Sequence, residues 1–245
     1  MKQFIIFGLN LVLALGMVGC AGKEEVFKQQ ITLNSKETVT SMPRSDKWWM
    51  DRHEAVVNRI KQGNVDLVMI GDSITRHWEN TGKAMWDQYY APRNAVNMGY
   101  SADRTQHVLW RLDNGEIAGI SPKLAVIMIG TNNSGSDKPQ DIADGIIAIC
   151  QKLRTNLPKT KILLLAIFPR ADRPDLMPVI NQTNELITQI TDNKHIYFLD
   201  INNKFLNPDS TLPKSVMPDL LHPNEKGYEI WAKAQEPMIK KLMKD

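Results

Sequence analysis

Short apolar runs alternate with longer segments of mixed polarity along most of the chain. The runs are DLVMIG at 66–71, NAVNMG at 94–99, LAVIMIG at 124–130, ILLLAIF at 162–168 and IYFLD at 196–200. Most of them are nearly continuous in apolar residues, which is the pattern of a parallel strand covered on both faces. The sequence therefore predicts a parallel β-sheet of about five strands.

The segments between these runs carry apolar residues at helical spacing. We expect helices at 48–62, 141–157, 177–191 and about 223–243, the last with Pro223 in its first turn, where a missing N–H costs nothing. This alternation of strands and helices predicts an α/β three-layer sandwich with right-handed crossovers. In such folds the functional site lies at the carboxyl ends of the strands.

The composition fits one domain of this kind. The 245 residues, 42% of them hydrophobic, suffice for one sizeable core and are too few for two comfortable domains. The formal charge of +3 arises from basic and acidic residues scattered along the chain, without a basic run or an aromatic-basic stripe. We therefore expect no nucleic-acid partner.

The N-terminal segment predicts export. Lys2 precedes an uncharged apolar stretch at 4–18, which is typical of a signal peptide at 1–19. The following Met17-Val18-Gly19-Cys20 resembles a bacterial lipobox, which implies that Cys20 becomes the lipidated first residue; an ordinary secretory signal with an incidental cysteine is the alternative. Residues 20–44 are polar and aperiodic, which favours a tether before a folded domain at 45–245. We expect a membrane-anchored lipoprotein on the periplasmic or cell-surface side.

The cysteines and histidines predict neither a disulfide framework nor a metal site. Only Cys20 and Cys150 occur, and acylation of the first leaves the second without a partner in the chain. Cys150 shares a helical spacing with Ile146, Ile149 and Leu153, so we interpret it as a core residue. No Cys/His cluster has the spacing of metal ligands, and we expect no metal and no other cofactor.

Residues suited to acyl transfer lie at the ends of the predicted strands. They are Ser73 after the first run, Gly99 at the end of the second, Asn132 after the third, and Asp219 and His222 between the last run and the last helix. A serine hydroxyl needs a base to take its proton, and that base needs an acid that fixes its tautomer. We expect Ser73 as nucleophile, His222 as base and Asp219 as its acid partner. The expected oxyanion hole comprises the backbone N–H groups of Ser73 and Gly99 and the side-chain amide of Asn132.

The sequence blocks around these residues resemble the SGNH/GDSL hydrolase family. The blocks are GDS at Ser73, NMG at Gly99, GTNN at Asn132, and DLLHP at Asp219 and His222, in the family's order. The resemblance implies a flavodoxin-like α/β/α fold and a serine esterase that needs no metal. Residues 97–133 and the sequence WWMDRHEAVV also resemble the catalytic subunits of platelet-activating-factor acetylhydrolase, which implies a short, often acetyl, ester. The final block, DLLHPNEKGYEIW, is similar to bacterial GDSL esterases, many of which deacetylate carbohydrates.

These patterns predict an exported serine esterase that hydrolyses short-chain esters through an acyl-serine intermediate, with a small-molecule or oligosaccharide ester as substrate. One alternative is a lysophospholipase or thioesterase of the same fold with a longer acyl pocket. Another is a non-catalytic lipoprotein that binds glycan or scaffolds a complex. Each motif residue also has a purely structural explanation, such as Ser73 as a helix cap. A purely structural account would, however, require five independent coincidences at residues that together fit one mechanism.

Overall fold

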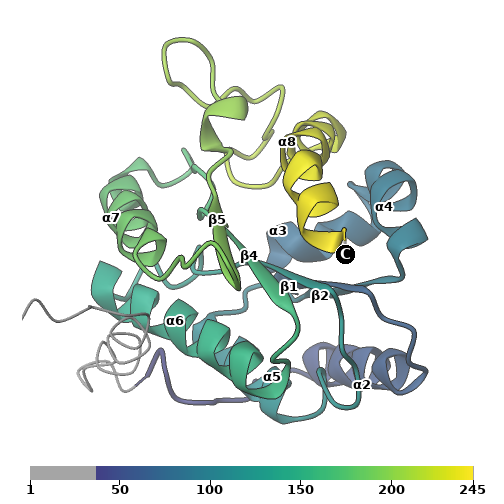
Figure 1. Ribbon diagram of the computed structural model, residues 1–245. Helices are drawn as coiled ribbons and strands as arrows, with labels where there is room; N and C mark the ends of the chain where they lie inside the picture. The colour runs from purple at the N-terminus through teal and green to yellow at the C-terminus, as the bar shows by residue number, and fades with distance from the viewer. Residues whose placement is uncertain (1–36, 245) are drawn as a thin grey trace, which may run out of the picture. The chain divides into compact units, whose positions relative to one another are not determined.

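The computed structural model describes residues 37–244. Its centre is a five-stranded parallel sheet in the order β2-β1-β3-β4-β5 (Figure 1). The strands are β1 (Leu67–Gly71), β2 (Ala95–Gly99), β3 (Leu124–Met128), β4 (Lys161–Leu165) and β5 (Ile196–Leu199). Each strand starts within one residue of the apolar run that predicts it, and the prediction of a parallel sheet is confirmed.

Helices cover both faces of this sheet. Within residues 37–244 they are α2 (Lys47–Lys61), α3 (Ser73–Arg76), α4 (Lys83–Tyr89), α5 (Thr105–Asp113), α6 (Pro139–Asn156), α7 (Met177–Thr188) and α8 (Glu225–Met243). Figure 1 shows α3, α4 and α8 on one face and α2, α5, α6 and α7 on the other. Every residue of β1 and β3 is consequently buried, which explains their uninterrupted apolar sequences. None of the helices in this range is long and apolar enough to cross a membrane.

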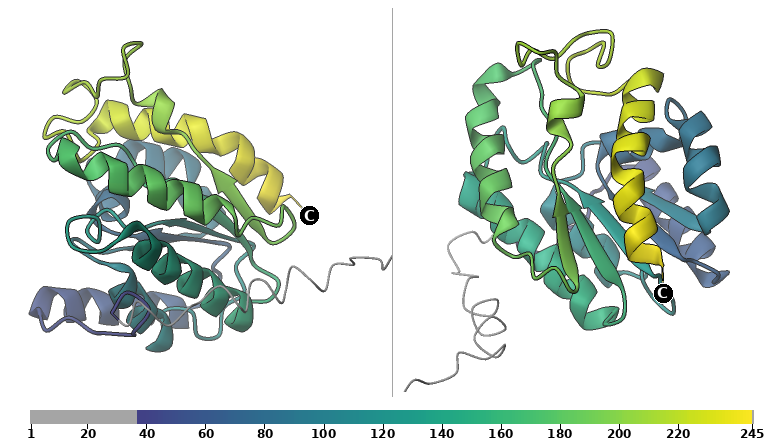
Figure 2. Two further views of the ribbon diagram at one scale, coloured as in Figure 1. Left: turned by 90° about the vertical axis from the view of Figure 1, so that its left-hand side faces the viewer. Right: turned by 45° about the horizontal axis from the view of Figure 1, so that its top comes forward.

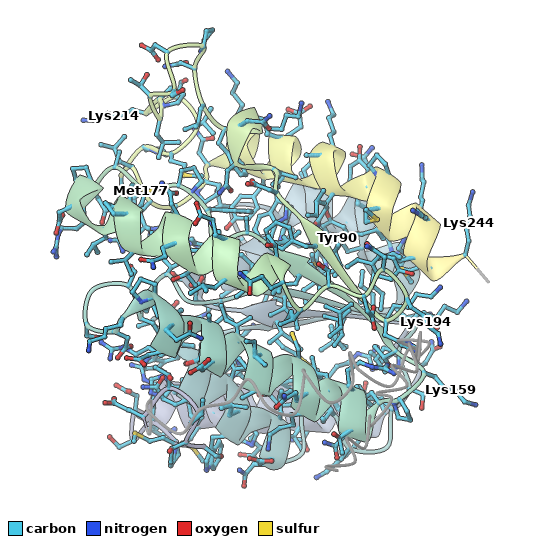
Figure 3. The ribbon with its side chains drawn as sticks, turned by 60° about the vertical axis from the view of Figure 1, so that its left-hand side comes forward. Tyr90, Lys159, Met177, Lys194, Lys214 and Lys244 are labelled. Carbon is cyan, nitrogen blue, oxygen red and sulfur yellow. The ribbon has the colours of Figure 1, made fainter. Side chains whose placement is uncertain are left out.

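The strand order fixes where a site can form. β1 lies between β2 and β3, so the chain leaves β1 toward one edge of the sheet and leaves β3 toward the other. Such a change of direction opens a crevice at the carboxyl ends of the two strands. Ser73 directly follows β1, and Asn132 lies just beyond β3. Lys159 and Lys194 precede β4 and β5 and so lie at the amino ends of the strands, away from this crevice. Figure 3 shows them at the same end of the molecule as Lys244.

The folded region starts earlier than the sequence predicts. Residues 37–44, assigned above to the tether, already pack against the domain. Thr38 is only 1% exposed; its hydroxyl donates to the Asp141 carbonyl over 2.7 Å, and its carbonyl accepts from the Thr105 hydroxyl over 2.9 Å. The boundary at residue 45 is therefore wrong, because polar hydrogen bonds rather than apolar periodicity attach this segment. The predicted signal peptide at 1–19 and Cys20 lie outside the described residues.

The last helix also begins differently from the prediction. Pro223 is not in its first turn, because α8 starts at Glu225 and Asn224 is its N-cap. The Asn224 side chain accepts a hydrogen bond of 3.0 Å from the Gly227 N–H, which satisfies one of the free donors of the first turn. The chain thus turns into α8 immediately after His222-Pro223, which holds the histidine close to the start of a long, packed helix. Cys150 is fully buried on α6, as the sequence predicts.

Candidate active site

Ser73 begins α3 immediately after β1. The strand ends at Gly71, where a Cβ atom would lie 2.1 Å from Thr75 Oγ1, so a larger residue would displace the helix. Asp72 caps α3 by accepting a hydrogen bond of 3.0 Å from the Ile74 N–H. This tight strand-to-helix turn presents Ser73, which is half-buried, at the carboxyl edge of the sheet.

Ser73, His222 and Asp219 form a continuous chain of hydrogen-bonding groups. Ser73 Oγ lies 2.9 Å from His222 Nε2, although 149 residues separate them in sequence. On the other side of the ring, His222 Nδ1 lies 2.6 Å from Asp219 Oδ2. With its proton on Nδ1, the imidazole donates to the carboxylate and can accept the serine proton at Nε2. The structure therefore brings together the three residues that the sequence assigns to acyl transfer.

Backbone geometry holds Asp219 in place beside the histidine. Its Oδ1 atom accepts hydrogen bonds from the N–H groups of Leu221 and His222, at 3.0 and 2.7 Å. The intervening Leu220 has a φ of 62°, in the left-handed region that L residues rarely adopt. Partial burial opposes ionisation of Asp219, but the His222 N–H, the His222 ring and the Leu221 N–H hold its pKa below the usual value. Asp219 is therefore a charged partner for the imidazole.

Asp72, next to the serine, has the opposite environment. It is fully buried, and its Oδ2 atom has no hydrogen-bond partner among residues 37–244. Burial raises the pKa of Asp72 to about 7, and the hydrogen bond from Ile74 offsets only part of this effect. The hydroxyls of Thr75 and Thr131 are also buried without a partner in the described range. A carboxyl group that stays protonated up to about pH 7 matches these neutral surroundings.

The Asn132 side chain is oriented by the loop after β2. Its Nδ2 atom donates to the Asp103 carbonyl oxygen over 2.9 Å, which uses one of the two amide hydrogens and leaves the other free to donate. The Asp103 carboxylate is itself held by the indole N–H of Trp49 at 2.7 Å and by Arg111 Nε at 2.9 Å. Asn132 thus rests on a backbone carbonyl whose own residue is anchored at both carboxylate oxygens.

This anchor belongs to a buried polar network. Arg111 is fully buried, and besides Asp103 it binds Glu116, which also accepts a hydrogen bond from the Tyr100 hydroxyl and lies 3.0 Å from His53 Nδ1. A buried guanidinium between two buried carboxylates is stable only because each charge is paired. No role was expected for these residues, because the burial of a charged side chain cannot be recognised from its position in the sequence.

Gly99 does not present its N–H to the site. That N–H donates to Asn97 Oδ1 over 2.8 Å, and the Gly99 carbonyl accepts from Arg52 Nε over 2.7 Å. The position requires glycine for a different reason: a Cβ atom there would lie 2.2 Å from the backbone nitrogen of Arg76. The close approach of α3 to β2 thus accounts for this glycine, and its predicted place in the oxyanion hole has no support in the geometry.

Two further residues, to which the sequence assigns no role, lie next to residues that hold or form the site. Ala102, in the loop that carries Asp103, is exposed, has a left-handed φ of 62°, and its N–H makes no hydrogen bond within residues 37–244. The His77 ring lies beside that of His222 in a tilted arrangement, with 5.3 Å between the ring centroids. Burial, together with the charges of His222 and Arg76, lowers the pKa of His77, so the second imidazole stays neutral. The unusual backbone of Ala102 leaves no trace in the sequence.

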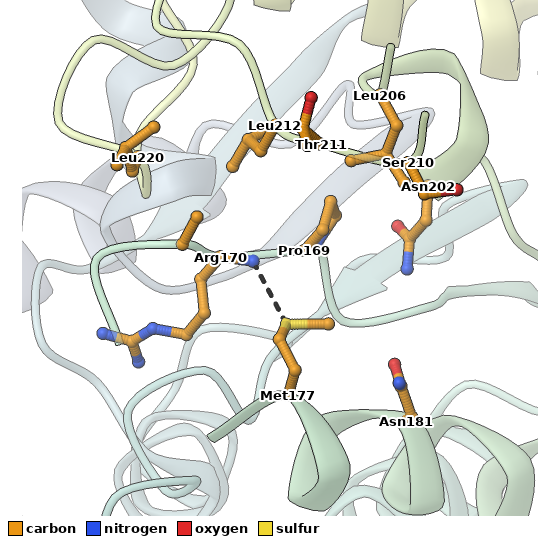
Figure 4. A pocket seen from close by; sticks show the side chains of 11 residues that line it. Pro169, Arg170, Met177, Asn181, Asn202, Leu206, Ser210, Thr211, Leu212 and Leu220 are labelled. Atoms are coloured by element: carbon orange, nitrogen blue, oxygen red, sulfur yellow. Dashed lines mark hydrogen bonds between the residues drawn. The ribbon is translucent and has the colours of Figure 1, made fainter. Parts of the chain in front are cut away.

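A cavity of about 460 Å³ adjoins the segment that carries Asp219 and His222 (Figure 4). Leu220 forms part of its wall, and the Leu220 carbonyl accepts a hydrogen bond of 2.8 Å from the Ala171 N–H. Met177 and Asn181 of α7 line the opposite side, as Figure 4 shows. Ser73 is not among the lining residues, so this cavity lies beside the serine rather than around it.

The fold and the site together define a hydrolase of the SGNH/GDSL type, built on a three-layer α/β/α sandwich. The model of the GDSL-like lipase/acylhydrolase family matches residues 69–230, a stretch that contains the serine, the asparagine and the Asp–His pair described above. The chain therefore belongs to the GDSL-like lipase/acylhydrolase family, and it is a carboxylic ester hydrolase.

Relatives with curated functions agree with this assignment. The human platelet-activating factor acetylhydrolase IB subunit alpha1 is 33% identical over 211 residues, which cover 85% of this chain and 90% of that protein. The rat subunit alpha2 is 32% identical over 204 residues, covering 82% and 88%.

Solved structures share the fold. A GDSL-like lipase from Bacteroides thetaiotaomicron superposes with a TM-score of 0.62 at 19% identity, covering 80% of this chain and 97% of that one. The acetylxylan esterase Axe2 from Geobacillus stearothermophilus superposes with a TM-score of 0.56 at 19% identity, covering 73% and 94%. The flavodoxin-like SGNH fold expected from the sequence is thus confirmed.

Proposed function

We propose that this protein is an exported, lipid-anchored serine esterase that hydrolyses short-chain esters, acetyl esters above all, through an acyl-Ser73 intermediate. The observation that carries the proposal is the chain of contacts from Ser73 Oγ to His222 Nε2 and from His222 Nδ1 to Asp219, at 2.9 and 2.6 Å. A serine at this distance from a correctly oriented imidazole is an activated nucleophile.

In the first half of the reaction, Ser73 Oγ attacks the ester carbonyl carbon while His222 Nε2 takes the serine proton. The carbonyl oxygen becomes an oxyanion, and the imidazolium is stabilised by the charged Asp219. The tetrahedral intermediate then collapses, the bond to the alcohol oxygen breaks, and His222 returns the proton to the departing alcohol. Ser73 is left as an acyl ester.

In the second half, water replaces the alcohol. His222 takes one proton from the water, and the resulting hydroxide attacks the acyl carbon of Ser73. When this second tetrahedral intermediate collapses, the proton returns to Ser73 Oγ and the carboxylic acid leaves. The same two side chains thus serve both half-reactions.

Donors for the oxyanion come from three segments in our proposal. The backbone N–H of Ser73 lies at the first turn of α3, and Asn132 offers the amide hydrogen that Asp103 does not use. We assign the third donor to the Ala102 N–H in place of Gly99, because the Gly99 N–H is bonded to Asn97 and that of Ala102 is free within residues 37–244.

A short acyl group is favoured by what surrounds the serine. Ile74, which follows the serine, is 1% exposed, Thr131, which precedes Asn132, is 3% exposed, and the cavity of about 460 Å³ does not include Ser73. Two relatives are named acetylhydrolases, and Axe2, which shares the fold, is an acetylxylan esterase. These names also support acetylated carbohydrates as one substrate class.

A series of 4-nitrophenyl esters tests the acyl-length proposal. The value of kcat/KM should be highest for the acetate and should fall with each added pair of methylenes, and Ser73→Ala should abolish turnover throughout. A maximum at long acyl chains would instead favour a lysophospholipase or thioesterase. Release of acetate from acetylated oligosaccharides then tests the carbohydrate class.

The lipid anchor rests on Cys20 and needs a separate test. Cys20→Ala should convert a protein that requires detergent for extraction into a soluble one, because acyl chains supply the anchor and stable attachment needs two or more. Equal membrane association of wild type and variant would contradict lipidation at this residue.

A further inference from the structure

Arginines surround an exposed tryptophan on the β2 side of the site. Trp48, in the first turn of α2, is 37% exposed. The guanidinium carbons of Arg44 and Arg76 lie 5.3 and 5.2 Å from the centroid of its ring. We refer to Arg44, Trp48 and Arg76 as the arginine rim. It lies beyond the edge strand β2, where α2 from one face of the sheet meets α3 from the other.

Hydrogen bonds attach this rim to the loop that carries the proposed oxyanion donor. Arg44 Nη1 donates to the Ser101 carbonyl over 2.9 Å, and Arg76 Nη1 donates to Ser101 Oγ over 3.3 Å. Ser101 directly precedes Ala102 in this loop. Arg76 is also the last residue of α3, the single-turn helix that Ser73 begins. Because Ser73 and Arg76 lie on the same helical turn, one substrate molecule could contact both residues.

The rim carries more positive charge than the carboxylates of residues 37–244 neutralise. Arg44 is paired with Asp46 at 2.9 Å, and the nearby Glu79 is occupied by Arg52, with both carboxylate oxygens bonded. No carboxylate of residues 37–244 lies within 4.0 Å of a side-chain nitrogen of Arg76 or Arg104.

Neighbouring histidines respond to this charge. Burial, followed by the positive charges of Arg44 and Arg104, lowers the pKa of His107 to about 4. Burial lowers the pKa of His77, which lies beside His222, and the charges of His222 and Arg76 act in the same direction. The positive charge of the rim therefore acts on His77, a neighbour of the catalytic histidine.

This arrangement suits an oxyanion ligand better than a purely structural role. Stacking on Trp48 uses the face of a guanidinium, and the one hydrogen bond that the Arg76 side chain makes within residues 37–244 leaves most of its five N–H donors free. A planar fork of N–H groups binds carboxylate or phosphate through two parallel hydrogen bonds, which neither water nor a hydroxyl matches. The exposed indole adds an apolar surface against which the rest of the alcohol can pack.

We propose that the arginine rim binds a carboxylate or phosphate group on the alcohol half of the ester, so that acidic sugars and polyol phosphates bearing acetyl groups are the preferred substrates. This inference rests on the proposed esterase function. The chemistry shared by the two sources is an oxyanion a few bonds from the acetylated hydroxyl. The rim thus selects the alcohol, while Ser73 and Asn132 act on the acyl group.

Two matched substrate pairs test the rim. Acetylated galacturonic acid differs from acetylated galactose by a carboxylate, and acetylglycerol phosphate differs from acetylglycerol by a phosphate. We expect kcat/KM to be about tenfold or more higher for the charged member of at least one pair, the usual size of a charge-assisted hydrogen bond. The pair with the larger ratio identifies the source of the oxyanion. Ratios near one for both pairs would overturn the inference.

Two variants assign the effect to the rim. Arg76→Gln should bring the ratio close to one. Lys47→Gln is the matched control: it removes one positive charge from the same turn of α2, where Lys47 is 88% exposed and paired with Asp51, and it should leave the ratio unchanged. A ratio that survives Arg76→Gln, or that falls equally with Lys47→Gln, would contradict a specific site.

Inhibition separates this inference from the proposed function. With 4-nitrophenyl acetate as substrate, galacturonate or glycerol 3-phosphate should inhibit competitively at concentrations about tenfold below those needed for galactose or glycerol. Turnover of 4-nitrophenyl acetate without such selectivity overturns the rim alone. Absence of any turnover overturns the esterase proposal, and calorimetric titration with the same four compounds then decides whether the rim binds oxyanions.

Discussion

Two aspartates precede the two residues that exchange a proton in the proposed mechanism. Asp72 comes directly before Ser73, and Asp219 comes three residues before His222. Asp72 is fully buried, with one oxygen unpartnered in the described range and a pKa raised to about 7. The Asp219 side chain is 56% exposed, accepts three hydrogen bonds and has a pKa below its usual value.

The contrast shows that environment rather than proximity in sequence determines the role of a carboxyl group. Asp219 is ionised and lies 2.6 Å from the imidazole, so it can fix the tautomer of His222 and stabilise its charged form. Asp72 caps the turn that presents Ser73, and its neutrality avoids a buried anion beneath the developing oxyanion. Substitutions of these residues and their neighbours separate the two roles.

Of the substitutions that separate the two aspartates, Asp219→Asn is expected to lower turnover most. An amide at this position would donate to His222 Nδ1, hold the imidazole in the wrong tautomer and lower kcat by about four orders of magnitude. The Asn oxygen can still accept from the Leu221 and His222 N–H groups, so the circular dichroism spectrum should be unchanged. Asp72→Asn is the matched control and should keep most of the wild-type kcat. Equal losses in both variants, or the greater loss at Asp72, would break the comparison.

A smaller loss of turnover is expected from Asn132→Ala, a substitution outside the surroundings of both aspartates. Its free amide hydrogen would stabilise a charge that is complete only in the tetrahedral intermediate, so kcat should fall by about two to three orders of magnitude with little change in KM. The Ser73 and Ala102 N–H groups would remain, which is why the loss should be incomplete. A rise in KM at constant kcat, in a variant with normal thermal stability, would remove Asn132 from the mechanism.

The parts of this site that the sequence predicts are those that follow from strand burial. Strands covered on both faces must be continuous in apolar residues, so the ends of β1 and β3, and hence the positions of Ser73 and Asn132, can be located within a few residues. Because the ends of parallel strands meet at one edge, residues far apart in sequence are expected to come together. The placement of Ser73 and Asn132 at one edge follows from this rule, whereas the Asp219–His222 pair lies well beyond the end of β5 at Leu199 and is located by its sequence motif.

The parts that the sequence does not predict depend on individual side-chain and backbone conformations. Gly99 resembles a donor in its motif, but the Asn97 side chain turns back onto its N–H. Thr38 lies in a polar segment with no apolar period, yet two hydrogen bonds bury it. Arg111 is fully buried on α5 because two carboxylates neutralise it, and neither pairing is visible in the order of residues.

The smallest effect on turnover is expected at Asp72, whose replacement should act on stability instead. Between about pH 4 and pH 7 the unfolded chain loses the Asp72 proton while the folded protein keeps it, so the stability of the wild type falls as pH rises. Raising this pKa from 3.8 to about 7 costs the folded state at most roughly 4 kcal/mol above pH 7. Asp72→Asn is free of this cost.

The melting temperature of Asp72→Asn relative to the wild type should therefore increase from pH 4 to pH 7 and then level off. In a domain of this size each kcal/mol shifts Tm by about 2–4 °C. Thermal melts of both proteins at a series of pH values measure this difference directly. A difference that stays constant, or that decreases with rising pH, would show that Asp72 is ionised in the folded protein and would remove the contrast with Asp219.

Covalent labelling of the nucleophile tests the central claim most directly. A phosphonofluoridate reacts with a serine activated by a neighbouring imidazole, and digestion followed by mass spectrometry locates the adduct. The account predicts a single adduct on Ser73, concurrent loss of esterase activity, no adduct in Ser73→Ala, and much slower labelling in His222→Ala. An adduct on another serine, or loss of activity without any adduct on Ser73, would contradict it.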